Sequence, residues 1–186
     1  MTPLCLARPV LALILLSVPS FAVPAFADRE RVEQSRFSGK AVPRYGTLRY
    51  NAVNGRQGPS LQHQILWRYE KAGLPVLVVR ETHNWVRVRD AAGDEVWMQT
   101  RMLEDARNLL VHSDTLLKKE PAQDSADQAK LKQGLIVEYR GCNAGWCAVQ
   151  IGRRSGYVPQ AHVWGADAPE SIYVQTSGVA PSGGTR

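Results

Sequence analysis

The amino-acid sequence predicts an all-β protein built from two small barrels in tandem. Three observations predict this fold: short runs of alternating apolar residues, turn residues between these runs, and an internal repeat with a period of 61 residues. About 130 residues remain between the expected end segments, which is enough for one ordinary domain or two very small ones. The repeat favours two domains, which we place at residues 44–105 and 106–165.

The repeat is clearest when the chain is read from Gly73 and again from Gly134. Each glycine opens an apolar run, and a tryptophan follows twelve residues later, Trp85 in the first copy and Trp146 in the second. Small apolar residues then alternate with other residues before a second turn and an aromatic strand. Further equivalent positions are Pro59 with Pro121, Val86 with Cys147, Val88 with Val149, Trp97 with Tyr157, and Leu103 with Val163.

Each copy contains the same series of predicted strands and turns. The runs VLVV and LIV are typical of buried strands, and WVRVR and WCAVQI alternate with the period of two expected of a half-buried strand. Turns at HN, NAG, DAAGDE and GRRSG separate the strands, because Asn and Gly adopt left-handed backbone angles at low cost. Closure into a barrel removes most of the exposed edges of such short sheets. We therefore expect a three-stranded meander and the strands upstream of it to form a small barrel in each copy.

Three segments lack this periodicity. Residues 28–43 are polar and charged and predict a leader, with a short helix as the alternative. Residues 118–130, KKEPAQDSADQAK, predict a long loop within the second copy. Residues 166–186 have the Ser, Gly and Pro content that is typical of a disordered tail.

Residues 1–27 predict a secretory signal peptide. Arg8 precedes an apolar run, and the small-residue pattern Ala25-Phe26-Ala27 predicts cleavage after Ala27. A retained N-terminal anchor is the alternative, although two prolines interrupt the run. No later segment approaches the roughly 20 consecutive apolar residues of a membrane-spanning helix. We therefore expect a periplasmic or secreted protein that starts near Asp28 and has no stable membrane span after cleavage.

The chain is basic, with 23 Lys and Arg residues against 17 Asp and Glu residues and a formal net charge of +6. Removal of Arg8 with the signal peptide leaves 22 − 17, a net charge of +5. Such a surplus favours anionic partners, among them lipid headgroups, acidic glycans and nucleic acid. Because an exported protein meets envelope polymers more readily than nucleic acid, we expect no nucleic-acid partner.

Cys142 and Cys147 flank the turn predicted at NAGW, while Cys5 would be removed with the signal peptide. Residues that face each other across such a hairpin have Cα atoms about 4.5 to 5.5 Å apart, which a disulfide accepts. Disulfides persist in the compartments that exported proteins reach. We expect a disulfide between Cys142 and Cys147. Two alternatives stay open at this point: two reduced thiols with Cys147 as a core residue, and a reactive thiol.

The sequence predicts no metal site, no cofactor and no catalytic residues. A single C-x4-C spacing lacks a second ligand pair, and the four histidines show no paired spacing. A cysteine nucleophile needs a base and an orienting partner, and His162, downstream of the cysteines, aligns with Met102 of the first copy. We therefore expect that the chain is not an enzyme. The alternative is a cell-wall hydrolase or redox protein that uses Cys142 or Cys147.

The repeated motifs resemble the bacterial SH3-like (SH3b) domain family, especially its exported tandem form in Gram-negative bacteria. They are the Gly-Leu-Pro-Val opening at Gly73, the Asn-Trp and Gly-Trp turns that end at Trp85 and Trp146, and the aromatic residue after the next turn. The first copy departs from the family at two places. Gly55 stands at the apolar position of the N-[VL]-R-x-G-P motif, and Val96 replaces the glycine of the later Gly-Trp-Val motif.

The resemblance covers residues 42–165 and implies two SH3-like barrels that form a binding or targeting module without catalysis of its own. Some relatives bind peptidoglycan peptides or partner proteins, so it implies an exported binding or scaffolding protein for a peptide, a cell-wall component or an envelope protein. A purely structural spacer is a further alternative. Large aromatic side chains usually fill cores, but those at turn edges can form a groove for an extended peptide. The candidate groove residues are Trp67, Trp85, Trp97, Trp146 and Tyr157, and nearby Arg87, Arg89, Arg153 and Arg154 would suit a carboxylate.

Overall fold

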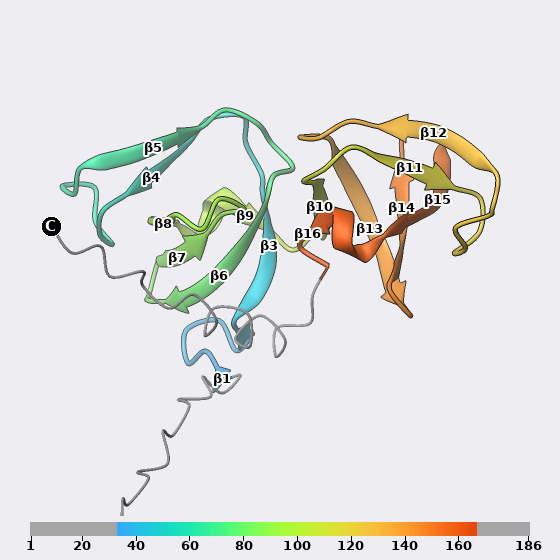
Figure 1. Ribbon diagram of the computed structural model, residues 1–186. Helices are drawn as coiled ribbons and strands as arrows, with labels where there is room; N and C mark the ends of the chain where they lie inside the picture. The colour runs from blue at the N-terminus through green and yellow to red at the C-terminus, as the bar shows by residue number, and fades with distance from the viewer. Residues whose placement is uncertain (1–32, 167–186) are drawn as a thin grey trace, which may run out of the picture.

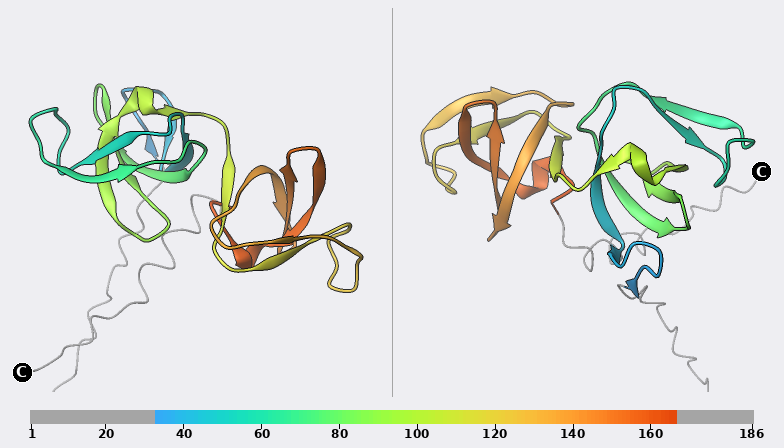
Figure 2. Two further views of the ribbon diagram at one scale, coloured as in Figure 1. Left: turned by 90° about the horizontal axis from the view of Figure 1, so that it is seen from above. Right: turned by 180° about the vertical axis from the view of Figure 1, so that it is seen from behind.

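The computed structural model describes residues 33–166, which form two curled antiparallel sheets of seven strands each and a short N-terminal hairpin (Figures 1 and 2). Each sheet makes one small barrel, and the two barrels lie side by side. The expected signal peptide, the start of the leader and nearly all of the expected tail lie outside the described residues. No helix in the described part of the chain has the length and apolar character needed to cross a membrane.

The first barrel has the strand order β5-β4-β8-β7-β6-β3-β9. The predicted meander is present as β6, β7 and β8, which pair in sequence. Buried residues alternate with half-buried ones along β7 and β8, as the sequence predicts. The strands are β3 (Arg44–Leu48), β4 (Val53–Arg56), β5 (Ile65–Tyr69), β6 (Pro75–Glu81), β7 (Trp85–Arg89), β8 (Glu95–Gln99) and β9 (Leu103–Glu104), with the 3-10 helix η1 (Thr100–Met102) before β9. Their core contains Leu48, Val53, Val76, Val78, Val86, Val88, Val96 and Met98.

The second barrel repeats this arrangement strand for strand, in the order β12-β11-β15-β14-β13-β10-β16. The internal repeat is therefore a repeat of topology, and Cys147 lies fully buried where the first barrel has Val86. The strands are β10 (Asn108–Val111), β11 (Thr115–Lys118), β12 (Asp127–Leu131), β13 (Ile136–Asn143), β14 (Trp146–Ile151), β15 (Arg154–Pro159) and β16 (Val163–Trp164), with the 3-10 helix η2 (Gln160–His162) before β16. Their core contains Leu109, Val111, Leu117, Leu131, Val137, Cys147, Val149, Val158, Val163 and Ala166.

The short helix considered for the leader is wrong, because its described part is a β-hairpin. Strand β1 (Glu33–Gln34) pairs with β2 (Ala41–Val42). The Gly39 amide donates to the Ser35 carbonyl in the turn, and Gly39 has a φ of +68°, which residues with a side chain rarely adopt. A proline follows Val42, and residues that precede proline disfavour the helical conformation.

The loop expected over residues 118–130 is shorter than predicted, because its last part is strand β12. This strand pairs with β11 and contributes Leu131 to the core. Its other side chains are polar or small, and Asp127, Gln128 and Lys130 are exposed. An edge strand that buries so little apolar surface leaves almost no periodicity in the sequence, which explains why it was missed.

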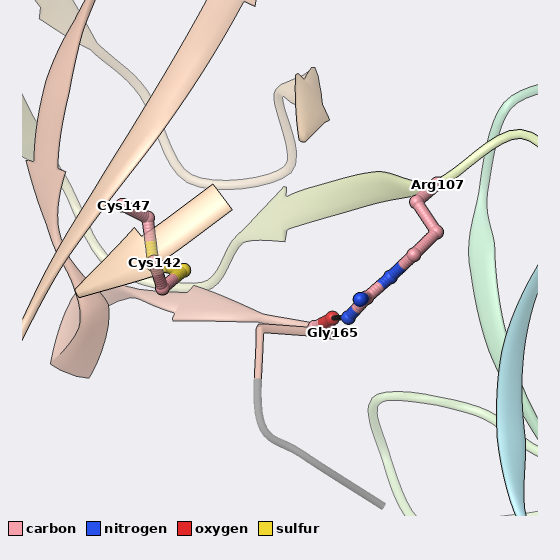
Figure 3. The surroundings of a disulfide bond; sticks show 4 residues. All are labelled: Arg107, Cys142, Cys147 and Gly165. Carbon is pink, nitrogen blue, oxygen red and sulfur yellow. Dashed lines mark hydrogen bonds between the residues drawn. A yellow bond between two sulfur atoms is a disulfide. The ribbon is translucent and has the colours of Figure 1, made fainter. Parts of the chain in front are cut away.

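Aromatic and cationic side chains join the two barrels. The Arg107 guanidinium lies 4.1 Å from the ring centroid of Tyr139 and 5.8 Å from that of Tyr45, and it donates to the Gly165 carbonyl at 3.0 Å (Figure 3). The Tyr45 ring meets Trp164 edge to face at a centroid distance of 5.2 Å. Because Tyr45 belongs to the first barrel and Trp164 to the second, these cation–π and aromatic contacts tie the barrels together.

Candidate binding groove

Cys142 and Cys147 form a disulfide across the hairpin of β13 and β14, which confirms the expected pairing (Figure 3). The two residues are register partners, and their Cα atoms lie 4.0 Å apart. The turn between the strands has Ala144 at φ +49° and Gly145 at φ +80°. A two-residue turn with two left-handed residues matches the twist of a hairpin. Both alternatives, reduced thiols and a reactive thiol, are excluded by this bond.

A groove of about 500 Å³ lies beside this hairpin on the second barrel. Gly141, Ala148 and Tyr157 are neighbours across three strands and form one row of its lining. Trp146 and Pro121 also line it. Because Cys147 and Val149 point into the core, Trp146 and Ala148 point to the outer face. The groove therefore has a floor of two small residues and walls of aromatic side chains and proline, a composition typical of small-ligand sites.

Lys118 holds the loop that carries Pro121. Its side chain is only 11% exposed, its Nζ lies 2.7 Å from Asp127 Oδ1, and it donates to the Ser125 carbonyl at 3.1 Å. The Ser125 hydroxyl in turn accepts from the Glu120 amide at 2.9 Å. Lys118 precedes this loop and its side chain contacts Ser125 and Asp127 at the other end of the loop, so these bonds restrict the movement of the segment that carries Pro121.

Long side chains occupy the same row in the first barrel. Arg80 pairs with Arg87, and Arg87 pairs with Trp97, at the positions of the floor row in the second barrel. Arg80 thus replaces Gly141, and Arg87 replaces Ala148. The first barrel consequently presents cationic side chains where the second has an open floor, so the two equivalent faces differ in what they can bind.

The small floor residues were missed by sequence reasoning, which selected aromatic residues as candidates. Gly141 and Ala148 attract no attention by themselves, because small residues are common in strands next to turns. Alignment of the two repeats carries the signal, since a glycine and an alanine there stand opposite two arginines.

The five aromatic candidates are divided between the barrels. Trp146 and Tyr157 lie together in the groove. Trp85 and Trp97 lie on the outer face of β7 and β8, and Trp67 is exposed on strand β5. None of the five is part of a buried core, so the alternative that these side chains fill the cores is wrong for them.

Of the arginines proposed as carboxylate partners, Arg87 lies on the outer face of the first barrel opposite Trp97, but the four do not lie beside the groove of the second barrel. Arg87 and Arg89 both form ion pairs with Glu95, at 2.8 and 2.6 Å. Arg153 and Arg154 lie at the far end of the β14–β15 hairpin, because Arg154 pairs with Ile151 whereas Trp146 pairs with Pro159. The expectation that they flank Trp146 is therefore wrong, since the whole length of the strand separates them.

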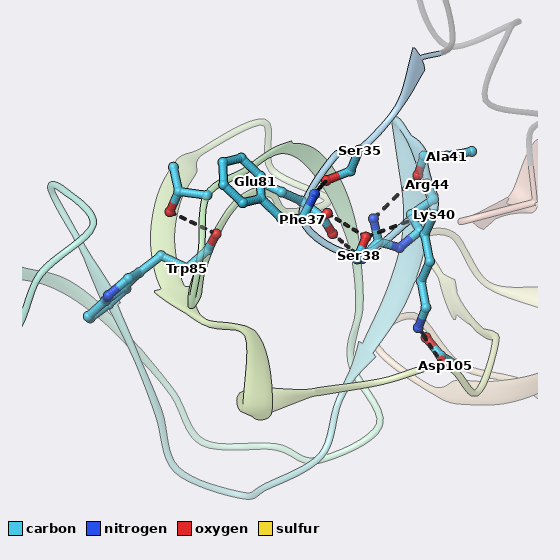
Figure 4. Close-up of polar contacts among 10 residues, drawn as sticks. Ser35, Phe37, Ser38, Lys40, Ala41, Arg44, Glu81, Trp85 and Asp105 are labelled. Carbon is cyan, nitrogen blue, oxygen red and sulfur yellow. Dashed lines mark hydrogen bonds and ion pairs between the residues drawn. The ribbon is translucent and has the colours of Figure 1, made fainter.

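Glu81 holds, in the first barrel, the position of Cys142. It pairs with Val86 at the end of the hairpin, as Cys142 pairs with its disulfide partner. The Ser38 hydroxyl donates to Glu81 Oε2 at 2.6 Å, and the Arg44 guanidinium contacts Oε1 (Figure 4). In the second barrel, a disulfide joins the two strands at the end of this hairpin. In the first barrel, a buried ion pair beneath the N-terminal hairpin stabilises the equivalent end.

Among the described residues, those that line the groove supply a shaped surface and apolar contact rather than a reactive group. In residues 33–166, no three His, Cys, Asp or Glu side chains gather as a metal-binding group. His162 Nδ1 lies 2.9 Å from the Thr115 hydroxyl, and both cysteine sulfurs are in the disulfide. The arrangement can therefore hold a ligand by stacking and close approach to the floor.

Reduction of the disulfide is expected to lower the free energy of unfolding of the second barrel by about 2 kcal/mol, because the bond closes a short loop in the unfolded chain. Urea unfolding with and without dithiothreitol measures this effect. The variant Cys142→Ser should show the same loss and no further effect of dithiothreitol. Alkylation of either cysteine by iodoacetamide in the native, unreduced protein would contradict the disulfide.

Comparison with known proteins matches both halves of the described chain to one family model. Residues 49–105 and 116–165 match the model described as bacterial SH3 domain. Among solved structures, NlpC2 and NlpC1 from Trichomonas vaginalis are similar to the chain at 15% and 14% sequence identity, with TM-scores of 0.32 and 0.30. The similarities cover 66% and 71% of this chain, which spans about half, 48%, of each of those structures. No curated protein matches the chain.

Proposed function

Because the chain belongs to the bacterial SH3 domain family, we propose that it is an exported, non-enzymatic binding protein whose ligand site is the groove of the second barrel. The observation that carries this proposal is the groove itself, with Trp146, Tyr157 and Pro121 around a floor of Gly141 and Ala148. Domains of this family are typically binding modules. The disulfide is consistent with a location outside the cytoplasm.

The shape of the groove favours an extended peptide as its ligand. Small residues in the floor let a peptide backbone approach the sheet, and the faces of Trp146 and Tyr157 supply apolar contact for side chains. In the cell envelope, peptides of this kind are the peptidoglycan peptides and exposed segments of envelope proteins. We propose the peptidoglycan peptide as the first ligand to test and an envelope protein as the second.

The disulfide also argues against the alternative of a hydrolase or redox protein. A nucleophilic mechanism requires a thiolate, and the sulfurs of Cys142 and Cys147 are bonded to each other. His162, the base considered from the sequence, is hydrogen-bonded to Thr115. The binding function therefore accounts for these residues better than the catalytic one.

Substitution of Trp146 by alanine is expected to lower binding to isolated sacculi about ten-fold, because it removes one aromatic wall of the groove. The chain from Asp28 onward, the expected exported form, is incubated with sacculi at low and high salt, and the cosedimented fraction is measured. Trp85→Ala is the matched control, since this tryptophan holds the equivalent position in the first barrel and should leave binding unchanged.

Three outcomes distinguish a site on the second barrel, a site on both barrels, and a protein ligand. Salt-resistant binding that is lost only in Trp146→Ala supports the groove of the second barrel. An equal loss in Trp85→Ala would move the site to both barrels and contradict this assignment. If sacculi are not bound, the peptidoglycan ligand is wrong, and capture of an envelope protein by the wild type but not by Trp146→Ala would identify a protein ligand for the same groove.

A further inference from the structure

The hairpin of β4 and β5 extends away from the rest of the first barrel (Figures 1 and 2) and carries four large apolar side chains in contact with solvent. The exposed fractions are 61% for Leu61, 45% for Ile65, 45% for Leu66 and 51% for Trp67. We call these four residues the apolar arm. Single exposed apolar residues are common, whereas a contiguous group of this kind marks an interaction site.

The apolar arm includes three consecutive exposed residues of strand β5, Ile65, Leu66 and Trp67. The ladder of β4 and β5 shifts register at Leu66, because Gly55 pairs with Trp67 and Arg56 pairs with Ile65. Strand β5 is also the last strand of its sheet, so one of its edges is unpaired within that sheet.

Backbone contacts keep the arm in one shape. Arg56 Nη1 donates to the Leu61 carbonyl at 3.0 Å and to the His63 carbonyl at 2.8 Å. The Gln57 amide donates to the Gln64 carbonyl at 2.9 Å across the hairpin. The exposed side chains are therefore presented by an ordered hairpin rather than by a strand that lacks local support.

Cationic residues outnumber acidic ones in the segment that contains the arm, and the equivalent part of the second barrel has no such surplus. Residues 49–71 hold four cationic residues and one acidic residue, 4 − 1, a net charge of +3. The equivalent residues 111–133 hold four lysines and four acidic residues, a net charge of zero. The strand equivalent to β5 there is β12, where Asp127, Gln128 and Lys130 are exposed. The apolar and cationic character is thus a property of one copy rather than of the fold.

We propose that the apolar arm is a peripheral membrane anchor, which inserts into the headgroup region of a bilayer that contains anionic lipids. Tryptophan and leucine side chains on a projecting element suit the boundary between headgroups and acyl chains. The net charge of +3 over residues 49–71, the segment that contains the arm, complements anionic headgroups. Arg68, with a side chain that is 64% exposed, stands next to Trp67 and can extend to the headgroups while the tryptophan inserts.

The test is flotation of the chain from Asp28 onward with vesicles of phosphatidylcholine and phosphatidylglycerol, beside vesicles of phosphatidylcholine alone. The double substitution Leu66→Ser and Trp67→Ser should lower partitioning into the anionic vesicles ten-fold or more, because it removes two inserting side chains. The matched control is Leu116→Ser, which removes an apolar side chain that is 37% exposed on the second barrel and should leave partitioning unchanged. Thermal unfolding of each variant checks that both barrels stay folded.

Flotation that needs both anionic lipid and the intact arm, with a blue shift of tryptophan emission that is lost in Trp67→Phe, supports the anchor. Absence of flotation overturns it, as does flotation that salt abolishes and the arm substitutions leave unchanged. A concentration-dependent dimer in sedimentation experiments, lost with the arm substitutions and without vesicle binding, would assign the arm to self-association instead. Trp146→Ala should leave vesicle binding intact, so failure of the groove and failure of the anchor are distinguishable.

Discussion

Replacement of Arg44 by methionine is expected to lower the free energy of unfolding of the first barrel by about 3 to 5 kcal/mol, because it leaves a buried carboxylate without its cation. The side chain of Glu81 is 3% exposed and that of Arg44 18% exposed, so water screens their ion pair very little. Urea-induced unfolding, followed by circular dichroism, measures the loss. A change no larger than that of an exposed arginine would contradict the structural role of this pair.

A double substitution provides the matched control for this prediction. With Arg44→Met and Glu81→Met together, no charge remains at the end of the hairpin, and an apolar pair of similar volume takes its place. The double variant should therefore be more stable than Arg44→Met alone, because removing both partners of a buried pair costs less than removing one. Additive losses from the two substitutions would show that the ion pair is not the source of the effect.

The pH dependence of the same variants tests the same pair. Burial acts to raise the pKa of the Glu81 carboxyl, but hydrogen bonds from Ser35, Ser38 and Arg44 and the charge of Arg44 together hold this pKa below its ordinary value. A lowered pKa contributes stability above the ordinary pKa of the unfolded chain, and this contribution is lost as the pH falls through the folded value. The stability difference between the wild type and Arg44→Met should therefore narrow on acidification through this range.

The role of Glu81 could not be predicted from the sequence, although the disulfide at the equivalent position could. The two cysteines are five residues apart, so the turn between them determines their pairing. Glu81 instead depends on Ser38, which is 43 residues away in the sequence. Contacts between distant segments leave no local pattern, and the N-terminal hairpin that supplies Ser38 is too polar to show strand periodicity.

The groove was predictable only in part, because strand alternation determines the places of some of its residues and an irregularity in the sheet determines the place of another. Trp146 and Tyr157 lie on adjacent strands, and alternation along each strand places them on one face. Gly141 joins them only because the ladder of β13 and β14 shifts register between Tyr139 and Gly141. Such an irregularity changes which residues share a face, and the sequence has no clear signal for its position.

One pair of departures from the family pattern has a common physical explanation. Gly55 and Leu117 hold the same place in the two barrels, and their neighbours on the next strand are Val96 and Gly156. A Cβ atom at Gly55 would lie 2.7 Å from Val96 Cγ2, and one at Gly156 would lie 2.8 Å from Leu117 Cγ. Each barrel thus places one large and one small residue at this contact, and the two barrels exchange their positions. Gly55, which interrupts the first family motif, is required because Val96 stands where the second family motif has a glycine.

Gly55→Leu is therefore expected to destabilise the first barrel by about 3 kcal/mol through overpacking, and the second substitution Val96→Gly should restore most of this loss. The three atoms nearest to the added Cβ all belong to the side chain of Val96, so removal of that side chain makes the room. In the second barrel, Gly156→Val should be equally harmful, but Leu117→Gly should restore little of the loss. There the added Cβ would also lie 2.5 Å from the backbone carbonyl oxygen of Lys118, which no side-chain substitution removes. Urea unfolding of the two double-mutant cycles measures both couplings, and failure of Val96→Gly to rescue Gly55→Leu would contradict the exchange of large and small residues as the cause.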